Sequence, residues 1–477
     1  MSQTIEGTNR VREQPEGTVR ALQKPPKLGL PPDVLICVFE QCIEYTKAVD
    51  IQRPDRRSAP LNMSQVCRLW RDISVSTPTL WRGLYIRGDV SYNLLSEFFR
   101  RSSTVTLDVH LRLDCDESST SSTPTSKAMG YTRTEILEFI QDLVLQEQRR
   151  WRSVYIHSTL PLHHGEDIFS SGTGPLLRDM CNIQELTLDT GRRWRIKLDL
   201  SMALGIHSLV LSGYGIFIRV SFPTLASLRR LKLRLGRRRP FNTYQSLIKS
   251  APNLEYLFVD LSNCAISQLN ESSSITYDRA RAYLPHLRYL FFYGGWNIPT
   301  DRITSRLCAI LNTIEADNLT GVHISGYAAT PTYTEALVRF LEVSGKCLVN
   351  VVMRVRVDTS CFLMASNYLP TVRRLVVVLE ELNCEVVAAM HIKEDTKEIR
   401  LPQLQELAIE CLECHCNADD LLEMLLSRTY DEEDCRKDAY KSLEKVSITG
   451  FPPNSVYLDE RYSLLKKRGC ILNCDFL

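Results

Sequence analysis

The chain has 477 residues, of which 44% are hydrophobic and 24% are charged, so it carries enough apolar surface to fold. Its 58 basic and 56 acidic side chains give a formal net charge of +2, which argues against overall attraction to nucleic acid or to an anionic membrane. The sequence contains no apolar run of about 18 residues and no apolar N-terminal segment, so we expect no membrane span and no signal peptide. These features predict an intracellular protein of the cytoplasm, the nucleus or both.

Residues 1–27 are polar and aperiodic, and we predict a disordered tail there. Residues 28–86 have helical periodicity. The first helix follows Pro31 and Pro32, and its apolar side chains recur at helical spacing: Val34, Leu35, Val38, Phe39, Cys42 and Ile43. A second helical stripe follows a polar connection: Val66, Leu69, Trp70 and Ile73. Pro78 then leads into Leu80 and Trp81, which completes a small helical module.

The three blocks LPPDVLICVFEQC, SQVCRLWRDIS and PTLW occur in the order found in the F-box, and the module resembles that family. A polar connection of about 15 residues, TKAVDIQRPDRRSAP, lies between the first two blocks and is similar to that of large fungal F-box families. The resemblance implies binding to a Skp-family adaptor and, through it, to a cullin-based ubiquitin ligase. It assigns the adaptor contact to Leu30, Pro31, Leu35, Val38 and Phe39. It assigns the packing of the module to Val66, Cys67, Trp70 and Trp81.

An apolar triplet spaced 0, +3 and +5 recurs through the remaining sequence, every 22 to 39 residues. Ten copies are present: Ile183/Leu186/Leu188, Ile206/Leu209/Leu211, Leu228/Leu231/Leu233, Leu254/Leu257/Val259, Leu287/Leu290/Phe292, Leu319/Val322/Ile324, Leu348/Val351/Met353, Val372/Leu375/Val377, Leu404/Leu407/Ile409 and Leu443/Val446/Ile448. Weaker copies begin at Trp81 and Trp151, and Val105, Leu107 and Val109 predict an alternating strand. The intervals lie near or above the ~20–29 residues of leucine-rich repeats.

Helical patterns separate many of these strands. They begin at Thr134, Thr243, Asp301, Thr334 and Asp419. Strand followed by helix, repeated, predicts an α/β solenoid with a parallel sheet, an irregular leucine-rich-repeat array over residues 87–477. A Ser/Thr-rich stretch interrupts the array, and we expect a disordered loop over residues 115–131.

If the +3 and +5 residues point inward, the residues at +2, +4 and +6 face the open side of the sheet. In three consecutive units this outward set is rich in basic and aromatic side chains. We predict that it binds a protein partner through Arg230, Lys232, Arg234, Tyr256, Phe258, Tyr289, Phe291 and Tyr293, with Asp260 among them. The alternative is that a loop, the C-terminal segment or the curvature of the sheet covers these side chains.

Chemical motifs are scarce. The sequence contains no P-loop, no G-x-S-x-G, no H-E-x-x-H and no strand-linked G-x-G-x-x-G, so we expect no enzyme and no cofactor. Cys411, Cys414, His415 and Cys416 in ECLECHC are spaced like metal ligands but lack a second pair, and we predict no metal site. We read the 16 cysteines as reduced.

The leading hypothesis is therefore a substrate receptor of a cullin-based ubiquitin ligase, which binds a Skp-family adaptor through the helical module and an unknown protein target through the repeats. A second hypothesis is a ubiquitin-independent repeat scaffold in which the helical module only caps the array. A third is an enzyme whose scattered catalytic residues form no sequence motif.

Overall fold

The computed structural model of the protein describes residues 30–46, 49–50, 59–87, 92–113, 145–158, 177, 179–190, 196–213, 216–219, 225–235, 241–262, 281–294, 300–326, 330–392, 399–429, 441–450 and 460–475. The predicted tail (1–27), the predicted loop (115–131) and the helix expected from Thr134 lie outside these residues. No helix within the described ranges is both long enough and apolar enough to span a membrane.

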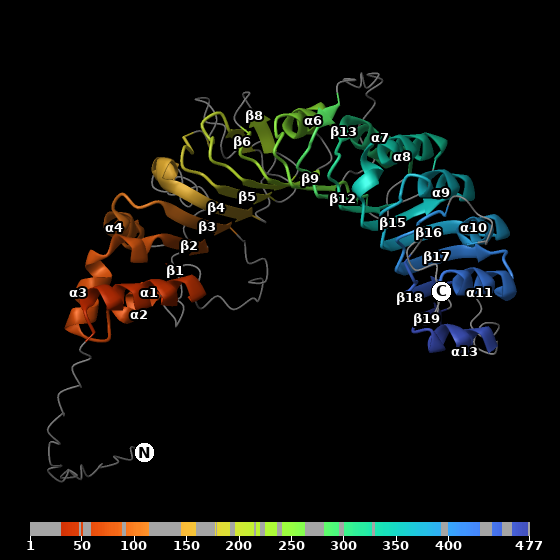
Figure 1. The fold of residues 1–477 in the computed structure, drawn as a ribbon. Coiled ribbons are helices and arrows are strands. Elements are labelled where there is room, and N and C mark those ends of the chain that lie inside the picture. Colours follow the sequence, from red (N-terminus) through yellow and green to blue (C-terminus); the bar gives the residue numbers. More distant parts are fainter. Residues whose placement is uncertain are drawn as a thin grey trace, which may run out of the picture.

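One long parallel sheet organises the molecule, and it bends into an arch (Figure 1). It has 15 strands, in the order β1 (Val49–Asp50), β2 (Gly83–Arg87), β3 (Leu107–Leu113), β4 (Trp151–Ser158), β5 (Glu185–Thr190), β7 (Ser208–Gly213), β9 (Arg230–Leu235), β10 (Tyr256–Asp260), β12 (Tyr289–Tyr293), β14 (Gly321–Ser325), β15 (Asn350–Val357), β16 (Arg374–Leu382), β17 (Glu406–Cys414), β18 (Lys445–Thr449) and β19 (Ile471–Asp475). Two small parallel pairs lie beside it, β6 (Ile196–Asp199) with β8 (Ile216–Arg219) and β11 (Ala282–Tyr283) with β13 (Ile314–Glu315). The parallel sheet predicted from the sequence is confirmed.

The apolar triplets form continuous rows across the sheet. Leu186 pairs with Leu209, and Leu209 pairs with Leu231, so equivalent residues of successive units lie side by side. Every residue of the ten predicted triplets is at most 4% exposed. Because side chains alternate along a strand, burying these rows turns the +2, +4 and +6 residues to the opposite face.

Most helices lie on the convex side of the arch, whereas the first three lie at its N-terminal end (Figure 1). The α-helices are α1 (Pro32–Thr46), α2 (Ala59–Met63), α3 (Arg68–Ser76), α4 (Tyr92–Ser102), α6 (Phe241–Lys249), α7 (Thr300–Thr313), α8 (Pro331–Ser344), α9 (Thr359–Ser366), α10 (Cys384–Met390), α11 (Ala418–Ser427) and α13 (Glu460–Lys467), with the 3-10 turns η1 (Pro78–Trp81), η4 (Leu145–Arg150) and η5 (Gly345–Cys347). Four of the expected helices correspond to α6, α7, α8 and α11. The helices and the inward rows share one hydrophobic core that runs from Leu35 to Leu472.

Side-chain caps start the helices directly after their strands. Asp358 follows β15 and accepts a hydrogen bond of 2.6 Å from the backbone N–H of Cys361 in α9. Asn383 follows β16 and caps α10, and Asn417 caps α11 after β17. A short polar residue at this position satisfies backbone N–H groups that the first helical turn leaves unpaired. The chain therefore turns at once onto the convex side, away from the concave face.

One strand lies further along the sequence than predicted. Val105 precedes β3, and the strand begins at Leu107 with an irregularity between Leu107 and Asp108. Val109 and Leu111 then pair with Val154 and Ile156 of β4. Leu107 pairs with Trp151 and Asp108 with Ser153, so the extra residue at this bulge is Arg152 of β4. Strand β3 itself alternates without interruption, and its inward residues are Leu107, Val109 and Leu111, each at most 1% exposed.

Candidate functional site

Helix α1 carries two adjacent apolar rows with opposite surroundings. Leu35 and Phe39 are 2% and 1% exposed and belong to the core. The Phe39 ring meets Trp70 of α3 edge to face at 4.8 Å between centroids. Trp81 is also buried, and its indole N–H donates to the Ser74 carbonyl at 2.6 Å. These residues hold the helical module together and join it to the first strands.

The other row of α1 is open to solvent. Leu30, Val34 and Val38 are 42%, 42% and 45% exposed, and Pro31 is exposed as well. Val66 and Leu69, at the turn between α2 and α3 and in the first turn of α3, are 60% and 47% exposed. Among the described residues, 14 large hydrophobic side chains are exposed, and five of them lie in this short segment. We call Leu30, Pro31, Val34, Val38, Val66 and Leu69 the outer apolar row.

These positions revise the residues expected to contact an adaptor. Leu30, Pro31 and Val38 are accessible, whereas Leu35 and Phe39 are buried in the chain's own core and present no surface to a partner. Val66 and Cys67, which were expected to pack inside the module, are exposed instead. The physical reason is that α1 is apolar on two neighbouring faces, and only one of them meets the rest of the chain.

The eight residues predicted to bind a partner come together on the concave face. Strands β9, β10 and β12 pair without a shift, so Arg230, Tyr256 and Tyr289 form one row, and Lys232, Phe258 and Phe291 form the next. Arg234, Asp260 and Tyr293 form a third row near the ends of the strands. We call this array the central patch.

Aromatic rings continue from strand to strand within the central patch. The Phe291 ring lies 5.2 Å from Tyr256, 6.4 Å from Phe258 and 5.8 Å from His323 of β14, measured between centroids. The Lys232 ammonium lies 4.8 Å from the centre of the Phe258 ring, within the range of a cation–π contact. His323 was not predicted from the sequence; its position in the same row could have identified it.

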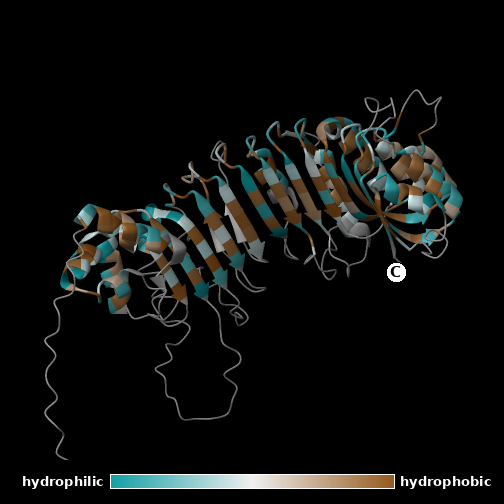
Figure 2. Cartoon of the chain, turned by 60° about the horizontal axis from the view of Figure 1, so that its bottom comes forward, coloured by the Kyte–Doolittle hydropathy of each residue, from teal (hydrophilic) through white to brown (hydrophobic). Residues whose placement is uncertain are grey.

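The patch is accessible from the concave side. Tyr289 is 48% exposed, and the other aromatic residues of the patch are partly buried against one another. No helix of the described part crosses these strands, whose concave face is turned toward the viewer in Figure 2. Tyr289 lies over Gly321, where an added Cβ would be 2.9 Å from the ring atom Cδ1. The glycine therefore gives the tyrosine room to lie against the sheet.

Burial and neighbouring charge hold the patch in defined protonation states. Burial, with a smaller contribution from Arg354, lowers the pKa of His323 below its usual 6.5, so the ring is neutral near pH 7. Burial also raises the pKa of the Tyr256 phenol. Asp260 is only 4% exposed, and Arg234 donates to it at 2.9 Å. Arg234 thus neutralises the buried carboxylate of Asp260, and Arg230 and Lys232 are not needed for this purpose.

A polar hollow of about 850 Å³ adjoins the patch at the amino ends of β7, β9, β10 and β12. His207, Arg229, Arg230, Glu255 and His286 line it, and Arg230 also belongs to the central patch. Sequence reasoning missed this feature because its lining comes from turns of four different units. His207, Arg229 and Glu255 of the lining stand immediately before their strands, so they belong neither to the apolar triplets nor to the outward set.

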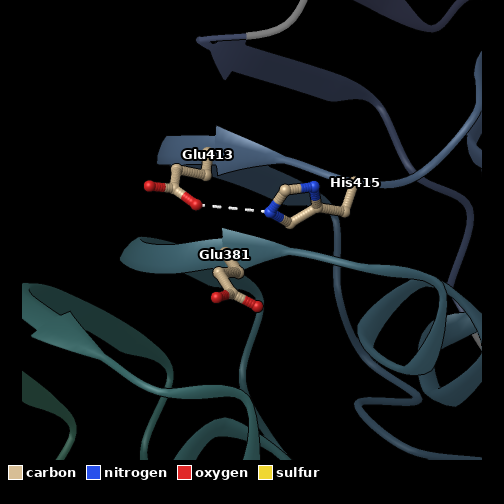
Figure 3. Close-up of side chains that lie close together, drawn as sticks. All are labelled: Glu381, Glu413 and His415. Carbon is tan, nitrogen blue, oxygen red and sulfur yellow. Dashed lines mark hydrogen bonds and ion pairs between the residues drawn. The ribbon is translucent and has the colours of Figure 1, made fainter.

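The cysteine-rich stretch does not gather around a single point. The sulfurs of Cys414 and Cys416 lie 3.6 Å apart, whereas the Nε2 atom of His415 lies 3.3 Å from Glu413 (Figure 3). Burial raises the pKa of the Cys411 thiol to about 11 and also raises that of Cys416, which favours protonated thiols over metal-binding thiolates.

Glu381, Glu413 and His415 are the one set of potential ligand atoms within 4.8 Å of one another that the described residues contain. An imidazole nitrogen and two carboxylates could hold a divalent cation such as Zn²⁺. All three side chains are exposed, however, and exposed acidic groups commonly gather without an ion. This geometry alone assigns no function.

Within the described residues, two surfaces thus stand out: the outer apolar row, with its exposed apolar side chains, and the central patch with its adjoining hollow. A search for family models that match the chain found none, and a search of curated proteins also gave no match.

Proposed function

We propose that this chain is the substrate-receptor subunit of a cullin-based ubiquitin ligase. The helices α1 to α3 would form an F-box-like module that binds a Skp-family adaptor, and the remaining chain would be an irregular leucine-rich-repeat solenoid that holds the target protein. The observation that carries the proposal is the outer apolar row on these helices.

The two apolar rows of α1 have separate uses. A helical cap needs one apolar face, and Leu35 and Phe39 already provide it. None of the large side chains of the outer row belongs to that core, and exposed apolar side chains that gather in one small module are typical of interaction sites. Leu30, Pro31 and Val38 are also among the residues that the F-box resemblance assigns to the adaptor. Burial of the outer row by an adaptor accounts for all of these features.

The mechanism would be one of proximity. The adaptor would hold the N-terminal helices, and the concave face would hold the target, so that a lysine of the target spends more time near the ubiquitin-loaded enzyme. Holding two reactants together raises their effective concentration without any catalytic group on the receptor. This division of labour requires no catalytic residue, metal or cofactor in the chain.

Calorimetric titration of the full-length chain with a purified Skp-family adaptor tests the proposal. Wild type should bind, and the double substitution Val34→Asp with Val38→Asp should weaken binding by about 100-fold or more, since two charges would be buried at the interface. Both side chains are exposed, so the melting temperature should stay unchanged. Leu464→Asp on α13 replaces another exposed apolar side chain of a helix, so it is the matched control and should bind normally. Absence of binding by the wild type contradicts the proposal.

A second candidate is a scaffold in which α1 to α3 only cap the sheet. The continuous core from Leu35 onward favours a capping role, and β1 pairs with β2 at this end of the sheet. Capping and adaptor binding use different rows, so Phe39→Ala should lower stability under either hypothesis. If the Val34→Asp and Val38→Asp variant retains full adaptor binding, or if the wild type has none, the scaffold is the better description.

A further inference from the structure

The central strands carry an uneven distribution of charge. The charged side chains concerned lie on the outward positions of β7, β9, β10, β12 and β14 and at the residue immediately before each strand. They include five cations, Arg229, Arg230, Lys232, Arg234 and Arg288, and two anions, Glu255 and Asp260. This local excess of three positive charges exceeds the net charge of +2 of the whole chain.

Both anions are already paired with arginines. Arg229 lies 3.3 Å from Glu255, and Arg234 lies 2.9 Å from Asp260. Arg230, Lys232 and Arg288 remain without a carboxylate partner within the described chain. Arg230 borders the hollow, and Lys232 lies on the Phe258 ring. The surface thus presents unpaired cations directly beside an aromatic row.

We propose that the central patch and its hollow bind an acidic segment of the target protein that carries one apolar anchor side chain. The anchor would lie on the rings of Phe258 and Phe291, and carboxylates on either side of it would meet Arg230 and Lys232. Arginine forms bidentate hydrogen bonds with carboxylates, and rigid aromatic rings bury area at little entropic cost. This inference rests on the second half of the proposed function, namely that the concave face captures a protein.

The surroundings of the patch favour a peptide over single-stranded nucleic acid. A protein that follows a phosphate backbone needs positive charge along the whole groove. Here the same row continues beyond His323 as Val352, Val376 and Ala408, which carry no charge. The aromatic row on which successive bases would stack therefore ends at His323, although a cation, Arg354 of β15, follows in the next row. A peptide with one anchor side chain needs only this short row of rings, whereas a nucleic-acid strand needs a longer stacking platform.

Selection of displayed random peptides of about 12 residues on the immobilised full-length chain tests the inference. We expect the enriched peptides to contain several Asp or Glu residues around a Leu, Phe or Trp. The double variant Arg230→Glu with Lys232→Glu should instead enrich Lys-rich and Arg-rich peptides. A loss of folding cannot invert a preference in this way, so the inversion separates recognition from stability.

Fluorescence anisotropy with one enriched peptide then measures how much Arg230 contributes to the affinity for the peptide. Arg230→Glu should weaken binding about tenfold or more, and added salt should reduce the difference. Lys445→Glu on β18 is the matched control, because Lys445 occupies the position of Arg230 in another unit, and it should leave binding unchanged.

Several outcomes overturn the inference: no enriched peptide, enrichment without acidic residues, equal loss in the Lys445→Glu control, or tighter binding of a single-stranded RNA of similar length. These outcomes leave adaptor binding by the outer apolar row untouched. Conversely, acidic peptides bound by a chain that ignores the adaptor would support this inference and contradict the ligase proposal.

Discussion

The central strands β9 to β12 and the C-terminal strands β16 to β18 share one interior and differ in their concave surface. In both regions the +3 and +5 residues form buried rows in register. Outside, the central strands combine rings with unpaired cations. The C-terminal strands have three cations and three anions among the equivalent positions, Arg373, Arg374 and Lys445 with Glu406, Glu410 and Glu444. The inward rows therefore set the fold, while the outward rows are free to differ and can specify a partner.

The first prediction concerns the shared interior, tested by truncating one inward leucine in each region. Leu257→Ala and Leu407→Ala remove leucines that are 0% and 1% exposed. Each should lower the free energy of unfolding by about 2–5 kcal/mol, because the lost contacts leave a cavity. Denaturant unfolding followed by circular dichroism measures both. A cost below about 1 kcal/mol at only one site would show that the two interiors are not equivalent.

The second prediction compares how substitutions in the central patch and on the concave face of β18 affect binding. Tyr256→Ala combined with Phe291→Ala removes two rings that lie 5.2 Å apart and should weaken target or peptide binding by about 30-fold or more. The matched pair Lys445→Ala with Ser447→Ala, at the same two positions of β18, should change binding by less than about twofold. Equal losses in the two double variants would remove the distinction between the regions.

A third prediction concerns the space that Gly321 leaves for the ring of Tyr289 in the central patch. Gly321→Ala places a Cβ 2.9 Å from Cδ1 of Tyr289, and the exposed ring can move aside. We expect binding to weaken about threefold to tenfold, with a stability change below about 1 kcal/mol. Tyr289→Ala provides the control, since the effect of Gly321→Ala should disappear in that background. An unchanged effect would mean that the glycine does not act through the tyrosine.

The smallest expected effect concerns pH. Burial and Arg354 lower the pKa of His323, so the unfolded chain binds a proton more readily than the folded chain. Stability from this group is fully present above its unfolded pKa of about 6.5 and is lost as pH falls toward the lowered folded value. The stability of wild type relative to His323→Asn should therefore decrease between about pH 7.5 and pH 5. A constant difference across this range would contradict the assignment.

The sequence predicted the sheet because its rows depend on local spacing. Each triplet repeats the same alternation, and the parallel pairing of units needs only that they stack. The strand at β3 was predicted two residues too early, because Val105 continues the apolar alternation of Leu107 and Val109 but lies in the turn that follows α4. The last strand, β19, places Leu472 in the row of Val446, yet it lacks a leucine-type first residue and was not predicted.

The site was less predictable than the fold. Val34 and Val38 share one face of α1, and Leu35 and Phe39 share the next; hydrophobic spacing alone cannot say which face the chain itself buries. The array in the central patch was predictable, since alternation determines which residues face outward. The hollow and the room provided by Gly321 were not, because they depend on turns and on the approach of neighbouring strands.

We propose that two separate surfaces of one chain bind two proteins, and hydrogen exchange of the full-length chain with a purified Skp-family adaptor distinguishes these surfaces. The adaptor should slow amide exchange in residues 30–46 and 64–76 and leave β9, β10 and β12 unchanged, whereas an acidic peptide should do the reverse. Adaptor-induced protection of the central strands, or none at α1 to α3, would contradict this proposal.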